Sequence, residues 1–207
     1  MSKGKGRDVR VTYGSTTKNV FAGQLNFRLS NGTGAASALN GDWVTFCTDL
    51  AQGTNSTNRS FDVVPLAQVP NGGPMGGMKA AAIMDLYTFA NGQQLAANAN
   101  QDLAAAFQIA VWEIVRDYDF TQGSSSLSLA SGDFKATGKN GNTLSSAIAG
   151  HVSSLFASIG SSTGSSSLLG LRNGSSQDQV LPVPAPGPAV LAAAAGLLAL
   201  PRRRRAA

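Results

Sequence analysis

The longest run without glycine or proline, residues 93–122, contains the segment that most constrains the fold. Between residues 102 and 119, apolar side chains recur at steps of three and four, which predicts a helix with one apolar face formed by Leu103, Phe107, Ala110, Val111, Ile114 and Tyr118. Asn100 is placed to cap this helix, and Asp102 puts negative charge in its first turn. Gln108 is the anomaly, because an amide beside an apolar face needs a partner.

Strand and turn patterns surround this helix. Two further helices are expected at residues 79–90 and 142–159, and strands at 9–13, 20–29, 42–50, 60–69, 127–134, 165–171 and 177–181. The first ten residues are expected to form a polar, basic tail. We therefore expect an α+β domain over residues 11–181, with a β-sandwich or barrel-like sheet, an inserted helical subdomain and a short hydrophobic helix near the C-terminus.

The formal net charge of +5 is concentrated at the two ends of the chain. Between residues 11 and 200 there are eight Lys and Arg against ten Asp and Glu. The body therefore has no basic surface of the kind that neutralises a phosphate backbone, which argues against a nucleic-acid partner.

Single copies of cysteine and histidine exclude several kinds of site. With only Cys47 and His151, the chain cannot form an internal disulfide or a Cys/His zinc site, and it shows no Ser-His-Asp signature around His151. Residues 72–77 are glycine-rich and precede a helix, but Pro74 and the missing Lys-Ser/Thr pair argue against a phosphate loop. We expect no metal and no cofactor.

The last 26 residues, 182–207, differ in composition from the rest. Residues 189–200 are entirely apolar or glycine, which as a helix is roughly 18 Å against a hydrocarbon core of ~30 Å. The arginines that follow predict a cytoplasmic end and an exported body; they are Arg202, Arg203, Arg204 and Arg205. So short a span fits a transient signal better than a permanent anchor.

This tail resembles the bacterial PEP-CTERM sorting signal, a Val-Pro-Glu-Pro-like motif followed by a short helix and an arginine cluster. The motif position is occupied by Val183, Pro184, Ala185 and Pro186, with Ala185 in place of glutamate. The resemblance implies processing by an exosortase-type transpeptidase and a location in the cell envelope or outside the cell. The first thirty residues lack an apolar run, so we expect either that the start codon is misassigned and the export signal is encoded upstream, or that the signal has been removed.

Residues 46–49 and 107–112 resemble the thioester domain of bacterial surface adhesins. They match its aromatic-Cys-x-Asp/Glu and Thr-Gln-x-Ala-(Ile/Val)-Trp patterns, with phenylalanine at 107 where the family has threonine. The resemblance implies that Cys47 is the thiol and Gln108 the acyl donor of an internal thioester, which captures amines on a protein or polysaccharide. The surrounding residues that it implies are Phe46, Asp49, Phe107, Ala110 and Trp112.

A thioester suits covalent capture because its thiolate, with an ordinary pKa near 8.5, leaves readily when an amine attacks. Two other functions stay open. In one, Cys47 is an ordinary buried cysteine and the chain is a non-covalent component of the envelope. In the other, Glu113, Asp117 and Asp119 serve a hydrolase, although Glu113 and Asp117 beside Arg116 are more typical of a solvated helix face.

Overall fold

A computed structural model describes residues 1–53, 57–91, 95, 100–161 and 167–183 and has an α+β fold. Seven strands form one antiparallel sheet in the order β4-β6-β7-β3-β2-β1-β5. The strands are β1 (Ser2–Tyr13), β2 (Thr16–Leu29), β3 (Gly41–Cys47), β4 (Asp62–Pro65), β5 (Phe134–Gly138), β6 (Ser167–Arg172) and β7 (Gln179–Val183). The helices that position the site are α1 (Gly76–Asn91), α2 (Gln101–Asp117) and α3 (Ser146–Ala157).

The two halves of the sheet meet at the end of β3. Strands β3 and β7 are joined through only two residue pairs, Phe46 with Val180 and Cys47 with Gln179. On the other side, β2 pairs with β3 only as far as Leu25 opposite Thr45. Among the described strands, Cys47 therefore pairs with β7 on one side and with no strand on the other.

A glycine lets β2 change its course just beyond that point. Gly23 has φ +153°, and a Cβ there would lie 2.3 Å from the backbone oxygen of Lys5. Only glycine accommodates so close an approach, and the β1–β2 register shifts between Lys3 and Gly6. As a result β2 stays with β1 and separates from β3.

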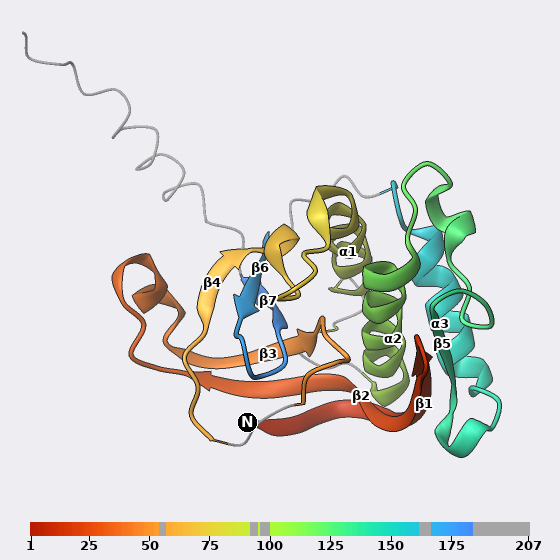
Figure 1. Ribbon diagram of the computed structural model, residues 1–207, viewed down its shortest axis with the longest axis horizontal. Coiled ribbons are helices and arrows are strands. Elements are labelled where there is room, and N and C mark those ends of the chain that lie inside the picture. The colour runs from red at the N-terminus through yellow and green to blue at the C-terminus, as the bar shows by residue number, and fades with distance from the viewer. Residues whose placement is uncertain (54–56, 92–94, 96–99, 162–166, 184–207) are drawn as a thin grey trace, which may run out of the picture.

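Helix α2 lies at the centre of the molecule and contacts α1, α3 and strands β1, β2, β3 and β5 (Figure 1). The N–H of Leu103 donates to Asn100 Oδ1 at 2.6 Å, which confirms the predicted cap. The sequence predicted burial of one apolar face of this helix, but all residues from Leu103 to Ile114 are buried. A helix covered on every side must bury its polar residues too, and Gln108 and Glu113 are among them.

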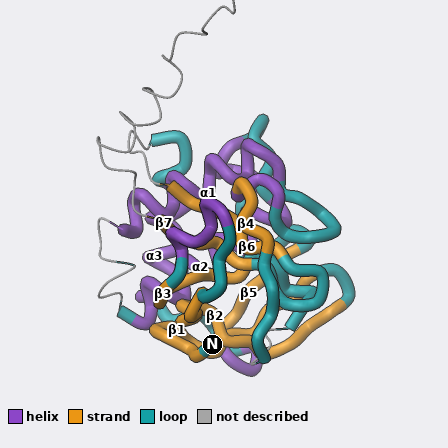
Figure 2. The backbone as a smooth tube through the Cα atoms, turned by 90° about the vertical axis from the view of Figure 1, so that its left-hand side faces the viewer, coloured by secondary structure: helices purple, strands orange, loops and turns teal. Residues whose placement is uncertain are grey.

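The N-terminal segment is not the loose polar tail that its composition predicts. Residues 2–13 form β1, which pairs with β2 from Ser2 opposite Asn26 to Tyr13 opposite Thr16. Both views place the N-terminus next to β2 (Figures 1 and 2). Side chains in the first half of β1 are mostly exposed, so backbone pairing holds this strand without the apolar alternation that sequence patterns detect.

Two other predicted strands differ in the structure. The strand expected at 127–134 is wrong, since those residues form turns and β5 begins only at Phe134. The strand expected at 60–69 is shorter, because β4 ends at Pro65 and a 3-10 turn, Leu66–Gln68, follows. Proline lacks the N–H that would continue the ladder.

Within the described ranges, no helix combines the length and apolar character needed to cross a membrane. Val183 ends β7. The rest of the predicted sorting signal lies outside the described residues: Pro184, Ala185, Pro186, residues 189–200, and Arg202, Arg203, Arg204 and Arg205.

Candidate thiol and amide site

Cys47 lies at the junction of the two half-sheets, and its side chain contacts a glutamine from the segment that leads into β7. The residue is 5% exposed. Its thiol donates to Oε1 of Gln177 at 2.8 Å, and Nε2 of Gln177 donates to the backbone oxygen of Asp49. Because a carbonyl carbon lies ~1.2 Å from its oxygen, the Gln177 carbonyl carbon is at most about 4 Å from the sulfur.

Gln108 also contacts Cys47, but through the backbone. The N–H of Cys47 donates to Gln108 Oε1 at 2.8 Å, and Gln108 Nε2 donates to the Cys47 carbonyl oxygen at 2.8 Å. The side-chain amide thus supplies the donor and acceptor that β2 would have offered had it continued beside β3. Both polar atoms of Gln108 are engaged in holding Cys47, which differs from the acyl-donor role implied by the family resemblance.

A third side-chain amide, that of Gln179 on β7, contacts the Cys47 sulfur. Its Nε2 lies 3.5 Å from Cys47 Sγ and 2.9 Å from the backbone oxygen of Gln177, to which it donates. Its Oε1 accepts from the Thr45 hydroxyl at 3.1 Å. Gln179 therefore orients both members of the Cys47–Gln177 contact and has less freedom than Gln177, which is only half-buried.

Aromatic side chains from α2, β3 and α1 pack against one another in the core. The Phe46 and Phe107 rings pack edge to face with centroids 4.7 Å apart, and Phe107 also meets Tyr87 at 6.1 Å. Phe46, Phe107 and Ala110 are all fully buried. Phe107, at the position where the adhesin family has threonine, is thus a core residue that packs against Phe46 and Tyr87.

A cavity of about 270 Å³ is lined in part by Cys47. Its lining also includes Gln177, Trp112 and Gln52. A larger cavity of about 790 Å³ reaches Gln177 from the side of β4 and the 30–33 loop. Gln177 lines both, so a molecule entering either cavity meets its amide.

Burial raises the pKa of the Cys47 thiol to about 12, with a smaller opposing effect from the Gln179 hydrogen bond and a raising effect from Asp49. The thiol is therefore protonated at neutral pH. Any reaction at sulfur must remove this proton in the same step, and a thiolate released at this site takes a proton back at once.

The predicted hydrolase carboxylates are bound to backbone groups. Asp117 accepts from the N–H groups of Asp133 and Phe134 at 3.1 and 2.9 Å, and Asp119 accepts from the N–H and hydroxyl of Thr121. Glu113 is fully buried and accepts from the Ser128 N–H at 2.6 Å, so the prediction of a solvated face is wrong for this residue. Among the described residues, no group of His, Cys, Asp and Glu could hold a metal ion.

Glu113→Gln is expected to flatten the pH dependence of stability. Burial raises the pKa of Glu113 from 4.5 to about 8, so between these values the unfolded carboxyl is ionised while the folded one keeps its proton. The unfolded chain then binds fewer protons, and the free energy of unfolding falls as pH rises through this window. Thermal melts from pH 5 to 8 should show a Tm that falls by several degrees in the wild type and stays level in Glu113→Gln. Asp42→Asn, at an exposed carboxylate, should retain the wild-type fall.

Sequence reasoning missed Gln177 and Gln179 as parts of the site. Neither lies in a motif that distinguishes it from the chain's other glutamines, and both reach Cys47 only through the β3–β7 pairing. Comparisons of the chain with protein-family models, with curated proteins and with solved structures found no match.

Proposed function

We propose that this chain is an exported surface or matrix protein that captures primary amines covalently through an internal thioester between Cys47 and Gln177. The observation that carries the proposal is the 2.8 Å contact between the thiol and the Gln177 amide oxygen. It favours Gln177 over Gln108 as acyl donor, because the Gln108 amide is engaged with the Cys47 backbone. The thioester is consumed by one capture, so the protein is not an enzyme.

Formation of the bond needs no outside reactant. The sulfur attacks the Gln177 carbonyl carbon, a C–S bond forms, and the C–N bond breaks. The amide nitrogen leaves as ammonia and carries away the thiol proton. Gln177 Nε2 already donates to the Asp49 backbone oxygen, which holds the amide in place beside the sulfur.

The resemblance of the tail to a PEP-CTERM signal supports the cellular side of the proposal. An exosortase-like enzyme at the membrane would remove the short hydrophobic helix and the arginine cluster, leaving the domain at the cell envelope or released. Its target there would be an amine-bearing surface protein or polysaccharide. Covalent attachment is useful in this setting, because the bond resists dilution and flow.

Intact-protein mass tests the proposal. The wild-type chain is expected to be lighter than its sequence by one ammonia, and Cys47→Ala should have the full mass of its own sequence. In protein recovered from its native cells, the same spectrum reports whether the residues after the Pro184–Pro186 motif have been removed. A full-length, full-mass wild-type chain with a titratable thiol would contradict both the thioester and the sorting.

A second candidate function is a non-covalent structural component of the envelope. The raised pKa of Cys47 favours it, because a buried, protonated thiol is a weak nucleophile. This alternative predicts no ammonia deficit and no uptake of methylamine.

A further inference from the structure

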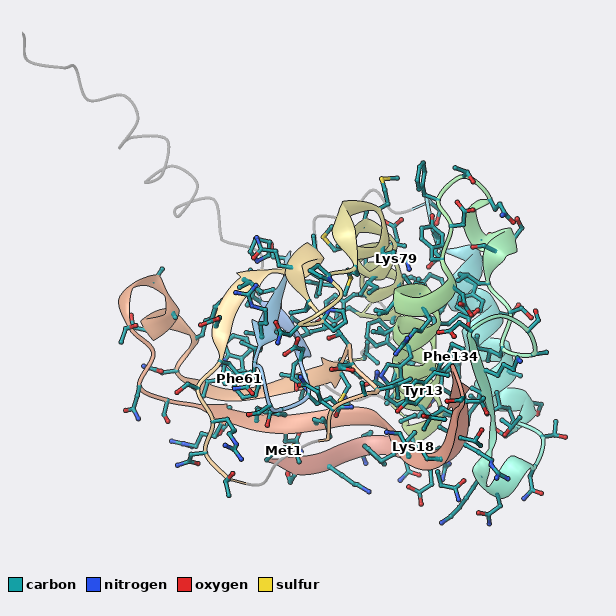
Figure 3. The ribbon with its side chains drawn as sticks, in the orientation of Figure 1. Met1, Tyr13, Lys18, Phe61, Lys79 and Phe134 are labelled. Atoms are coloured by element: carbon teal, nitrogen blue, oxygen red, sulfur yellow. The ribbon has the colours of Figure 1, made fainter. Side chains whose placement is uncertain are left out.

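The larger cavity, of about 790 Å³, lies between two stretches of chain that are far apart in the sequence. One wall is formed by residues 27–33, at the end of β2 and the start of the loop to β3, and the other by residues 57–63, which lead into β4. The walls meet where the Phe27 and Phe61 rings pack edge to face with centroids 6.1 Å apart. Figure 1 shows the β2–β3 hairpin extending past β4, and Figure 3 shows Phe61 where the segment before β4 passes this hairpin. Ligand sites are typically concavities of roughly 300–1,000 Å³, and this cavity falls within that range.

Neutral side chains that both donate and accept hydrogen bonds make up most of the polar lining. All of the following are exposed, so a ligand in the cavity can reach them: Asn31, Asn40, Asn58, Ser30, Thr33 and Ser60. Amides and hydroxyls of this kind match the hydroxyl groups of a sugar, because each partner can donate one hydrogen bond and accept another. The neutral lining therefore favours a ligand rich in hydroxyl groups.

The charged side chains of the lining favour an acidic group on that ligand. Among the described residues they are Arg28, Arg59 and Asp62. Asp62 is paired with Arg172 at 3.4 Å, and Arg28 is paired with Asp42 at 3.2 Å. Arg59 is exposed and forms no ion pair within the described chain. Its guanidinium presents N–H donors in a fixed fork that matches a carboxylate.

We infer that this cavity binds an acidic polysaccharide. Arg59 pairs with a uronate carboxylate, the asparagines bind sugar hydroxyls, and the half-buried Phe61 offers apolar surface to the C–H face of a sugar ring. An acidic peptide would also satisfy Arg59, but it would bring fewer hydroxyl groups to the neutral lining.

This inference rests on the proposed function for its setting and deepens it by naming the class of target. Gln177 lines the same cavity, so a chain held there lies beside the proposed acyl donor. The binding itself is non-covalent and does not need the thioester. The two can therefore fail independently.

The test uses the full chain carrying Cys47→Ala, which cannot form the thioester, and the probe is hexagalacturonate followed by titration calorimetry. In this background Arg59→Gln should weaken binding by roughly 10-fold or more, because it removes the paired hydrogen bonds to a carboxylate. Arg10→Gln is the matched control, since it removes the same charge from an exposed arginine outside the cavity that donates to the Asn140 backbone oxygen at 3.3 Å. It should bind like its Cys47→Ala parent.

Two further probes test the class of ligand. Hexagalacturonate should bind more tightly than a glutamate hexapeptide with as many carboxylates, and more tightly than the uncharged galactose oligomer of the same length. Equal or tighter binding of the peptide would overturn the saccharide assignment. Equal binding of the uncharged oligomer, unchanged by Arg59→Gln, would overturn the role of Arg59.

The result is read separately from the thioester. A folded chain that binds no hexagalacturonate overturns this inference, whether or not the wild type shows the ammonia deficit. Binding that depends on Arg59 in a protein whose wild type shows no deficit supports this inference and contradicts the thioester alone.

Discussion

Gln177→Met is expected to abolish both the ammonia deficit and the uptake of methylamine while the chain keeps its fold. Methionine has nearly the length and volume of glutamine but no acyl carbon. The wild-type bond would also link residues about 130 positions apart, which in the chain-entropy model stabilises the fold by about 5 kcal/mol. The variant should therefore unfold at lower denaturant concentration than the wild type, as should wild-type protein after methylamine treatment.

Gln24→Met is the matched control for this prediction. It removes a buried amide whose partners are the Lys5 N–H and the Leu95 backbone oxygen, away from Cys47, and it leaves Gln177 able to react. It should retain the ammonia deficit. If Gln177→Met kept the deficit and Gln108→Met lost it with the fold intact, the acyl donor would be Gln108, as the family resemblance implies.

Gln108→Leu is expected to destabilise the fold strongly and to prevent the bond from forming. Leucine leaves the N–H and C=O of Cys47 without their partners at the point where β2 has already separated from β3. A buried unpaired polar group costs about 1–3 kcal/mol, so the two together should lower the free energy of unfolding by about 2–6 kcal/mol. Denaturant unfolding, with the methylamine-treated wild-type chain or Cys47→Ala as reference, measures this loss apart from that of the cross-link.

Gln24→Leu separates the two effects of that substitution. Gln24 is also buried and also joins two backbone groups, accepting from the Lys5 N–H at 3.0 Å and donating to the Leu95 oxygen at 2.6 Å. It should lose comparable stability but keep the ammonia deficit, because it does not contact Cys47. A Gln108→Leu chain with wild-type stability and an intact deficit would contradict the positioning role.

The sequence was most informative where local pattern decides structure. The helix was predicted at residues 102–119 and is observed at Gln101–Asp117. This helix, its Asn100 cap and the need of Gln108 for a buried partner all follow from side-chain spacing within a few turns. The proximity of Gln108 to Cys47 follows from no such pattern, and only the two matched motifs suggested it. Asp102, predicted to interact with the helix dipole, also forms an ion pair with Arg7 at 2.7 Å. Arg7 lies on β1, a segment that the composition predicted to be a loose tail.

The position of the proposed acyl donor, Gln177, could not be predicted in the same way. Gln177 meets the thiol because β7 crosses the molecule to pair with the last two residues of β3. Non-local strand pairing of this kind has no short-range signature. The full burial of α2 was not predicted, because it also depends on non-local packing. Helices α1 and α3 cover the face of α2 that was expected to be exposed. The alanines at 104, 105 and 106 gave no warning, since alanine fits either a solvent-facing or a closely packed surface.

The most direct measurement is to locate the methyl group after the wild-type chain has reacted with methylamine. Tandem mass spectrometry of the peptides should find a methylamide at Gln177, unmodified Gln108 and Gln179, and a Cys47 thiol that can be alkylated only after unfolding. A methylamide at Gln108 would contradict the assignment of the acyl donor. A chain that takes up no methylamine and shows its full mass would contradict the thioester itself.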